Sequence, residues 1–138
     1  MSSTLTVTNL TATNLTDGAG TTSTFANVAS GTAKAWVNFD GTGTIAARDS
    51  FNLSSLTDLG EGRYKTTVSN AMSGTSYMVL ATAGNELSDY ATQNDTDDHI
   101  AFLGARTSTE QSVFSADHDD GIQDDCQAMN LSVFGDLA

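Results

Sequence analysis

The apolar residues of the chain follow two different periods. Between residues 5 and 17 they recur every five positions, in the units Leu-Thr-Val-Thr-Asn, Leu-Thr-Ala-Thr-Asn and Leu-Thr-Asp. From residue 32 onward they alternate with polar residues, which is the period of a strand that buries one face. The first pattern predicts an extended N-terminal β arm or stem, and the second predicts a head built from strands.

The five-residue repeat carries apolar side chains that so short a segment cannot bury by itself. They are Leu5, Val7, Leu10 and Leu15. We therefore expect residues 1–20 to form an assembly stem or attachment arm in which several copies wind together, rather than a disordered Thr-rich leader. Residues 21–31 are small and uncharged, which predicts a flexible linker.

The head is predicted to span residues 32–138 and to contain about seven short strands. The clearest of them cover residues 33–39, 63–68, 100–105, 111–116 and 127–134. A further strand is expected over 44–53, and a turn over 56–62. Residues 77–83 place apolar side chains on both faces of a strand, which predicts a central strand covered on both faces. This spacing predicts an all-β fold, an antiparallel β-sandwich.

Aromatic residues that lie on the predicted strands are assigned to the core. They are Trp36, Phe39, Phe51, Tyr64, Tyr77 and Phe134. Tyr90, Phe102 and Phe114 flank two acidic segments, and we expect them to pack in the core or between copies, with contact to a glycan as the alternative.

Cys126 is the only cysteine, so an intrachain disulfide is excluded and a buried position on a strand is expected.

Composition agrees with the predicted fold class and narrows the function. The chain has 138 residues, with 21 Thr, 15 Ser and no Pro, and β-branched Thr favours strands. Five basic residues stand against 17 acidic ones, which gives a net charge of −12. Such a charge excludes a conventional nucleic-acid binder and disfavours an anionic membrane surface. The apolar runs are too short to span a bilayer, and the N-terminus does not resemble a signal peptide.

Several segments resemble a module found in bacteriophage fibre proteins. They are Gly31-Thr32-Ala33-Lys34-Ala35-Trp36-Val37-Asn38-Phe39, the stretch from Arg48 to Asp58, Tyr64 with Asn70-Ala71-Met72, and the final Leu131-Ser132-Val133-Phe134-Gly135-Asp136. The similarity is to C-terminal domains of tail fibres, and the Leu-Thr-Val-Thr-Asn repeat is similar to the fibrous stems that precede such domains. It covers roughly residues 31–138.

This resemblance implies a virion protein that is assembled in the host cytoplasm and has no catalytic residues. It implies an intertwined homotrimer with a thin β-stem and a β-sandwich head. The implied partners are the chain itself, another virion protein of the tail or the major capsid protein, and a glycan of the host surface. Because the chain is short for a tail fibre, a capsid decoration protein bound at three-fold positions through its arm is the alternative. A Ca²⁺- or glycan-binding β module is a further alternative.

Two acidic segments are the candidates for cation binding. Asp95, Asp97 and Asp98 lie in the first, and Asp117, Asp119 and Asp120 lie in the second. Carboxylates are the oxygen ligands that Ca²⁺ takes, but the second segment does not have the spacing of an EF-hand loop. We expect a solvated acidic rim, with Ca²⁺ binding as the alternative and no other cofactor. Two histidines and one cysteine do not supply a closed zinc site, so no metal site is assigned.

No catalytic motif stands out along the chain. The nucleophile elbow Gly-x-Ser-x-Gly, the Ser-x-x-Lys pair, the Walker loop and the dinucleotide fingerprint are all absent from the sequence. The sequence therefore predicts a protein that is not an enzyme.

Overall fold

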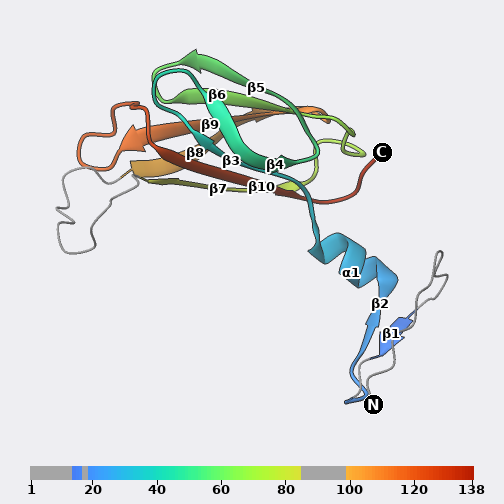
Figure 1. The fold of residues 1–138 in the computed structure, drawn as a ribbon. Helices are drawn as coiled ribbons and strands as arrows, with labels where there is room; N and C mark the ends of the chain where they lie inside the picture. Colours follow the sequence, from blue (N-terminus) through green and yellow to red (C-terminus); the bar gives the residue numbers. More distant parts are fainter. Residues whose placement is uncertain (1–13, 17–18, 85–98) are drawn as a thin grey trace. The chain divides into compact units, whose positions relative to one another are not determined.

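A computed structural model describes residues 14–16, 19–84 and 99–138 (Figure 1). The chain divides into two compact units, Met1–Thr32 and Ala33–Ala138. Ten strands and one short helix make up the described elements, and every strand pair is antiparallel. The predicted all-β class is thereby confirmed.

The described part of the first unit is a small hairpin followed by a helix. Strand β1 (Asn14–Thr16) pairs with β2 (Thr22–Thr24), and α1 (Phe25–Gly31) follows directly. The Thr24 hydroxyl caps this helix by accepting a hydrogen bond from the Asn27 amide at 3.1 Å. The sequence predicted no regular element over residues 21–31, and the Thr cap is the local signal that was overlooked. Leu5, Val7 and Leu10 lie outside the described residues, whereas Leu15 lies in β1.

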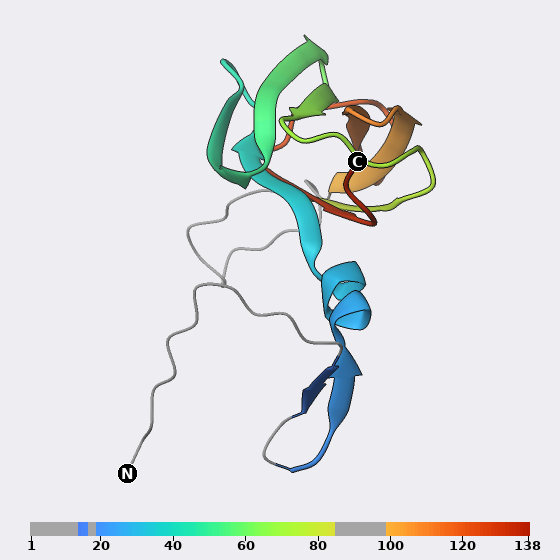
Figure 2. The ribbon, with the colours of Figure 1, turned by 90° about the vertical axis from the view of Figure 1, so that its right-hand side faces the viewer.

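The second unit consists of two four-stranded antiparallel sheets (Figures 1 and 2). The first sheet contains, in spatial order, β4 (Ala46–Phe51), β3 (Ala33–Asp40), β10 (Ala128–Phe134) and β7 (Met78–Gly84). The second contains β5 (Leu53–Gly60), β6 (Arg63–Val68), β9 (Glu110–Asp117) and β8 (His99–Arg106). This arrangement is consistent with the predicted β-sandwich.

The core is built from alternate residues of the inner strands of both sheets. Its buried members include Val37 and Phe39 of β3, Tyr64 and Val68 of β6, Val113 of β9, and Met129, Leu131 and Val133 of β10. Phe39 and Tyr64 meet edge to face, with ring centroids 5.1 Å apart, and so join the two sheets. The strands predicted over 63–68, 111–116 and 127–134 are confirmed, each with the buried face that its alternation indicates.

Two boundaries between β3 and β6 differ from the prediction. The expected strand over 44–53 ends at Asn52, whose φ of 56° turns the chain out of β4 and into β5 of the other sheet. The Asn52 side chain supports this conformation, because its amide donates to the Lys34 carbonyl at 2.9 Å. The expected turn over 56–62 is wrong, since Leu56 to Gly60 belong to β5 and the turn is confined to Glu61 and Gly62.

The expectation that residues 77–83 form a central strand is also wrong. Strand β7 is an edge strand of the first sheet, and only alternate residues such as Val79 face the core. Met78 and Leu80 on the opposite face are 52% and 53% exposed. Apolar residues on both faces of a strand therefore do not show here that both faces are covered.

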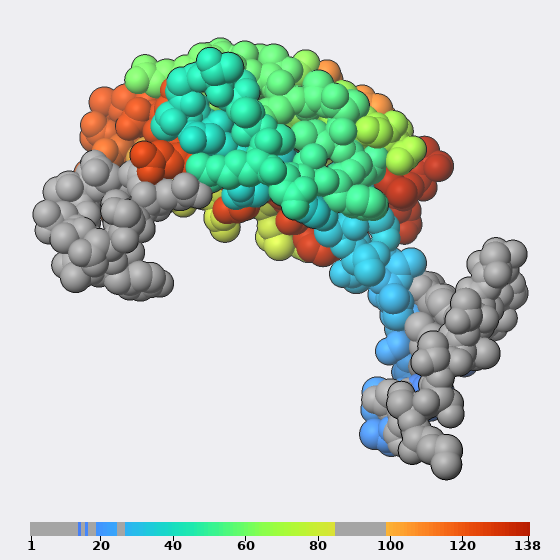
Figure 3. Space-filling view, viewed as in Figure 1, coloured from blue at the N-terminus to red at the C-terminus, as the bar shows by residue number. Residues whose placement is uncertain are grey.

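Three of the six aromatic residues assigned to the core are buried, namely Phe39, Tyr64 and Tyr77. Trp36 lies three residues before Phe39 on the same strand, so it points to the outer face and is only half-buried. Phe51 pairs with Trp36 from strand β4 and is 54% exposed, which makes its core assignment wrong. All of β4 is exposed, and its turquoise residues lie beside the green β5 on the surface shown in Figure 3.

Candidate functional site

The acidic segment between β9 and β10 is a structured turn. The Asp117 side chain accepts a hydrogen bond from the Asp119 amide at 2.7 Å, and the Asp120 side chain accepts one from the Ile122 amide at 2.8 Å. These are Asx turns, in which a carboxylate caps the backbone two residues further along. Asp119 and Asp120 are exposed, in agreement with a solvated acidic surface.

The end of this segment is anchored to the core by Asp125. Its Oδ1 atom accepts two hydrogen bonds, one from the Gly62 amide at 2.7 Å and one from the Tyr64 hydroxyl at 2.8 Å. The Asp124 amide also donates to the Ser115 carbonyl. Sequence reasoning did not find this anchor, because Asp125 and Tyr64 are far apart along the chain and no local pattern links them.

Two titratable groups beside the anchor are held in their neutral forms. Burial raises the pKa of the Tyr64 phenol well above its ordinary value of 10.0. Burial likewise raises the pKa of the Cys126 thiol, which is buried as expected but lies just before β10 rather than on it. A thiol held protonated is a poor nucleophile, so the geometry gives Cys126 a packing role.

The raised pKa of Tyr64 makes the protein sensitive to alkali. Below pH 10 the phenol is neutral in both states, whereas above pH 10 only the unfolded chain ionises it. From this group alone, we expect the free energy of unfolding to fall with a slope that starts near pH 10 and approaches about 1.4 kcal/mol per pH unit as the pH rises further. Urea unfolding of the Tyr64→Phe variant at pH 8 to 11 checks this, because the variant should show a shallower decline. Equal declines in both proteins would assign the alkaline sensitivity to other groups.

The described residues contain no group of three or more His, Cys, Asp or Glu side chains that could hold a metal ion. His118 Nδ1 lies 3.5 Å from Asp119, and His99 Nε2 lies 3.6 Å from Asp124, so each histidine has a local carboxylate. Asp95, Asp97 and Asp98, which make up the first acidic candidate, lie outside the described residues.

The Asx turns lead to an expectation for cation binding at the second acidic segment. Since Asp117 and Asp120 already cap their own backbone, this turn does not need a cation to hold its shape. We expect the melting temperature to change by no more than about 1 °C between millimolar Ca²⁺ and excess chelator, because only a ligand that binds the native state stabilises it. A rise of several degrees in Ca²⁺ would contradict this and favour the Ca²⁺-binding module.

Phe102 and Phe114, the described members of the aromatic candidates, face each other across β8 and β9 on the outer face of the second sheet. Arg63 of β6 continues the same row next to Phe114. The Phe114 ring covers Gly104, where a Cβ atom would collide with it, while Phe102 is 49% exposed. The structure therefore brings these two aromatic residues together, and the third candidate, Tyr90, lies outside the described residues.

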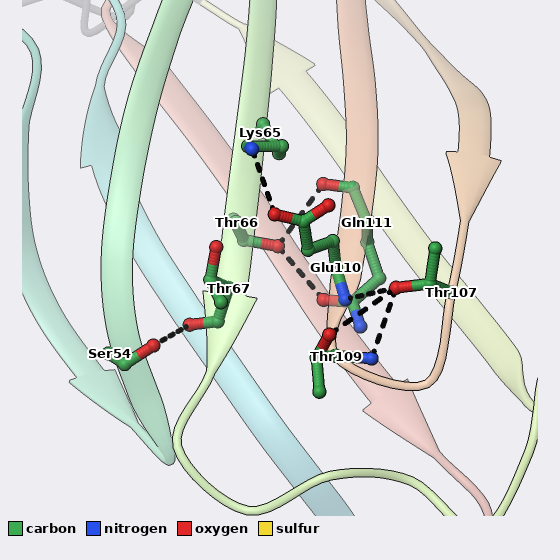
Figure 4. Close-up of polar contacts among 8 residues, drawn as sticks. All are labelled: Ser54, Lys65, Thr66, Thr67, Thr107, Thr109, Glu110 and Gln111. Carbon is green, nitrogen blue, oxygen red and sulfur yellow. Dashed lines mark hydrogen bonds and ion pairs between the residues drawn. The ribbon is translucent and has the colours of Figure 1, made fainter.

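A polar network lies between β6 and β9 (Figure 4). Thr66 donates to the Gln111 side-chain oxygen at 3.0 Å, and the Gln111 amide donates to the Tyr77 hydroxyl at 3.1 Å. On the outer face, Lys65 and Glu110 form an ion pair at 2.8 Å. Thr66 and Gln111 are buried and satisfy each other, so this network positions the strands and the start of β7.

A shallow hollow of about 340 Å³ lies beside the C-terminal segment. It is lined by residues 72–77 together with Gly135 and Asp136. The Ser73 amide donates to the Asp136 carbonyl at 2.8 Å, which holds the two segments together. Its side chains offer hydroxyls and one carboxylate, with no histidine among the lining residues, so they do not form a nucleophile with an adjacent base.

None of the helices among the described residues is long and apolar enough to cross a membrane. Comparison of the chain with protein-family models, with curated proteins and with solved structures finds no match. The functional argument therefore depends on the residues and geometry described above.

Proposed function

We propose that the chain is a surface protein of a bacteriophage virion without enzymatic activity. In this proposal it forms a short homotrimeric fibre, with residues 1–20 as the stem and the two-sheet unit as a head that projects outward. One observation carries the proposal. Along the chain, an N-terminal unit that contains the periodic leucines is followed by a unit with an antiparallel β core. The resemblance of residues 31–138 to tail-fibre domains supports the same assignment.

The acidic surface of the head is compatible with exposure on a virion. Its acidic turn is exposed, and a net charge of −12 keeps copies on a crowded particle from adhering to one another through their solvated faces. Within the proposal, the exposed Phe102 ring, with Phe114 beside it, offers an apolar surface on which a host glycan can stack.

Gold-labelled antibodies against the head, applied to purified particles of the phage that encodes the chain, test this proposal. Label on the tail is expected, and adsorption of the phage to its host should fall when the antibody is present. Label confined to the capsid would show that the chain is a capsid decoration protein and not a tail fibre. Particles without label would overturn the virion assignment itself.

A further inference from the structure

The first sheet carries large apolar side chains on the face that points away from the core. One row crosses all four strands, and the strand register places its members side by side. We call this the outer row; it consists of Phe51, Trp36, Ser132 and Leu80. Phe51 and Leu80 at its two ends are more than half exposed. Met78 and Phe134 form an adjoining pair, so the apolar surface extends beyond a single row.

Three neighbouring polar side chains of this face are linked by hydrogen bonds. The Asn38 side-chain amide donates to the Asn130 side-chain oxygen at 2.7 Å, and the Asn130 amide donates to the Thr82 hydroxyl at 3.2 Å. Polar groups that already have partners can be covered at little cost in free energy, whereas unpaired ones cannot. The part of the face formed by Asn38, Asn130 and Thr82 can therefore be buried at little cost, whereas the same row ends on β4 at the exposed carboxylate of Asp49.

Charge divides this face into two halves. Strands β7 and β10 contain no charged residue, although the chain carries 22 of them. By contrast, every strand of the second sheet contains at least one, and Arg63, Lys65 and Glu110 point outward there. The charged residues of the first sheet lie on β3 and β4, and Lys34, Asp40 and Asp49 point to the same outer face as Trp36. The uncharged half of this face is therefore the half formed by β10 and β7.

We propose that the outer row is the surface on which the head packs against a second copy of this chain. This inference rests on the self-assembly proposed above. Two copies that each carry −12 repel wherever carboxylates meet, so a contact between copies is favoured over the apolar, uncharged half formed by β10 and β7 and the adjoining Trp36. The stem would hold the heads at high effective concentration, and packing of sheet faces then buries Phe51, Trp36 and Leu80.

Trp36 is the only tryptophan of the chain, so its fluorescence reports directly on the outer row. The test compares the full-length protein with Leu80→Glu and with the control Leu59→Glu. Leu59 is also exposed, at 42%, but it lies on β5, an edge strand of the other sheet. Sedimentation equilibrium gives the assembly state, and acrylamide quenching gives the accessibility of Trp36 at the same concentrations.

We expect Trp36 to be protected from the quencher in the assembled protein and in Leu59→Glu. Leu80→Glu should lose this protection and weaken assembly by about tenfold, because it brings a charge into an apolar contact. If Leu80→Glu does not fold, as judged by circular dichroism, Leu80→Ser serves in its place with a smaller expected loss. Equal quenching in all three assembled proteins would overturn this inference and leave the stem-based trimer intact. If Trp36 is still protected when the protein is a dilute monomer, another segment of the same chain covers the outer row, and the inference is overturned. A full-length protein that is monomeric at every concentration would overturn both proposals.

Discussion

Replacement of Phe39 by alanine is expected to lower the free energy of unfolding by about 3–5 kcal/mol, the range for a large aromatic residue removed from a core. Phe39 is fully buried on β3, and its ring meets Tyr64 of the other sheet edge to face. The substitution therefore leaves a cavity between the sheets and removes their central aromatic contact. Urea denaturation followed by circular dichroism measures the change.

Phe102→Ala is the matched control for this prediction. It makes the same change in side-chain size at a residue that is 49% exposed on an edge strand. We expect a loss of at most about 1 kcal/mol, which is the value of one cross-strand aromatic pair. Similar losses at the two positions would contradict the assignment of Phe39 to the centre of the core.

The second large effect is expected for Gly62→Ala. Gly62 has a φ of 61°, and a Cβ atom built there would lie 2.5 Å from the Ser115 carbonyl oxygen and 2.7 Å from the Asp124 amide nitrogen. Both neighbours are backbone atoms, so they cannot turn aside as a flexible side chain could. A loss of about 2–5 kcal/mol is expected, the sum of the left-handed conformation and of overpacking.

Gly43→Ala is the control that separates the cost of the left-handed conformation from the cost of overpacking at Gly62. Gly43 has nearly the same φ, 62°, but a Cβ atom there would meet no atom within 4 Å. Its substitution should therefore show the conformational part alone, about 1–2 kcal/mol. A loss at Gly62 no larger than that at Gly43 would show that the acidic segment is not packed against the backbone of this turn.

Alternation predicted the inner strands well, because their neighbours on both sides enforce one buried face. Residues 63–68 and 127–134 are examples, with Tyr64 and Leu131 buried as their positions indicate. It failed at edge strands, where a side chain can be apolar and still exposed, as with Leu80 and Phe51. Whether a strand is central or at an edge is decided by long-range pairing, which a local pattern does not contain.

The candidate site could be predicted only in part for a similar reason. The acidic turn after β9 and the position of Phe114 just before it were visible in the sequence, because each depends on neighbours along the chain. The pairing of Phe102 with Phe114 was not, because it depends on the register of β8 and β9. The Asp125 anchor and the Thr66–Gln111 pair were not, since both join segments that only the sheet topology brings together. The outer row likewise becomes visible only once the register of four strands is known.

Light scattering on the full-length protein and on a chain that lacks residues 1–20 tests the central claim most directly. The account predicts a full-length particle of about three times the chain mass of 14.3 kDa, and a truncated protein that is mainly monomeric at micromolar concentration. A trimer that survives truncation would place the main interface in the head and make the N-terminal segment an attachment arm. A full-length protein with the mass of a single chain would contradict the trimeric fibre.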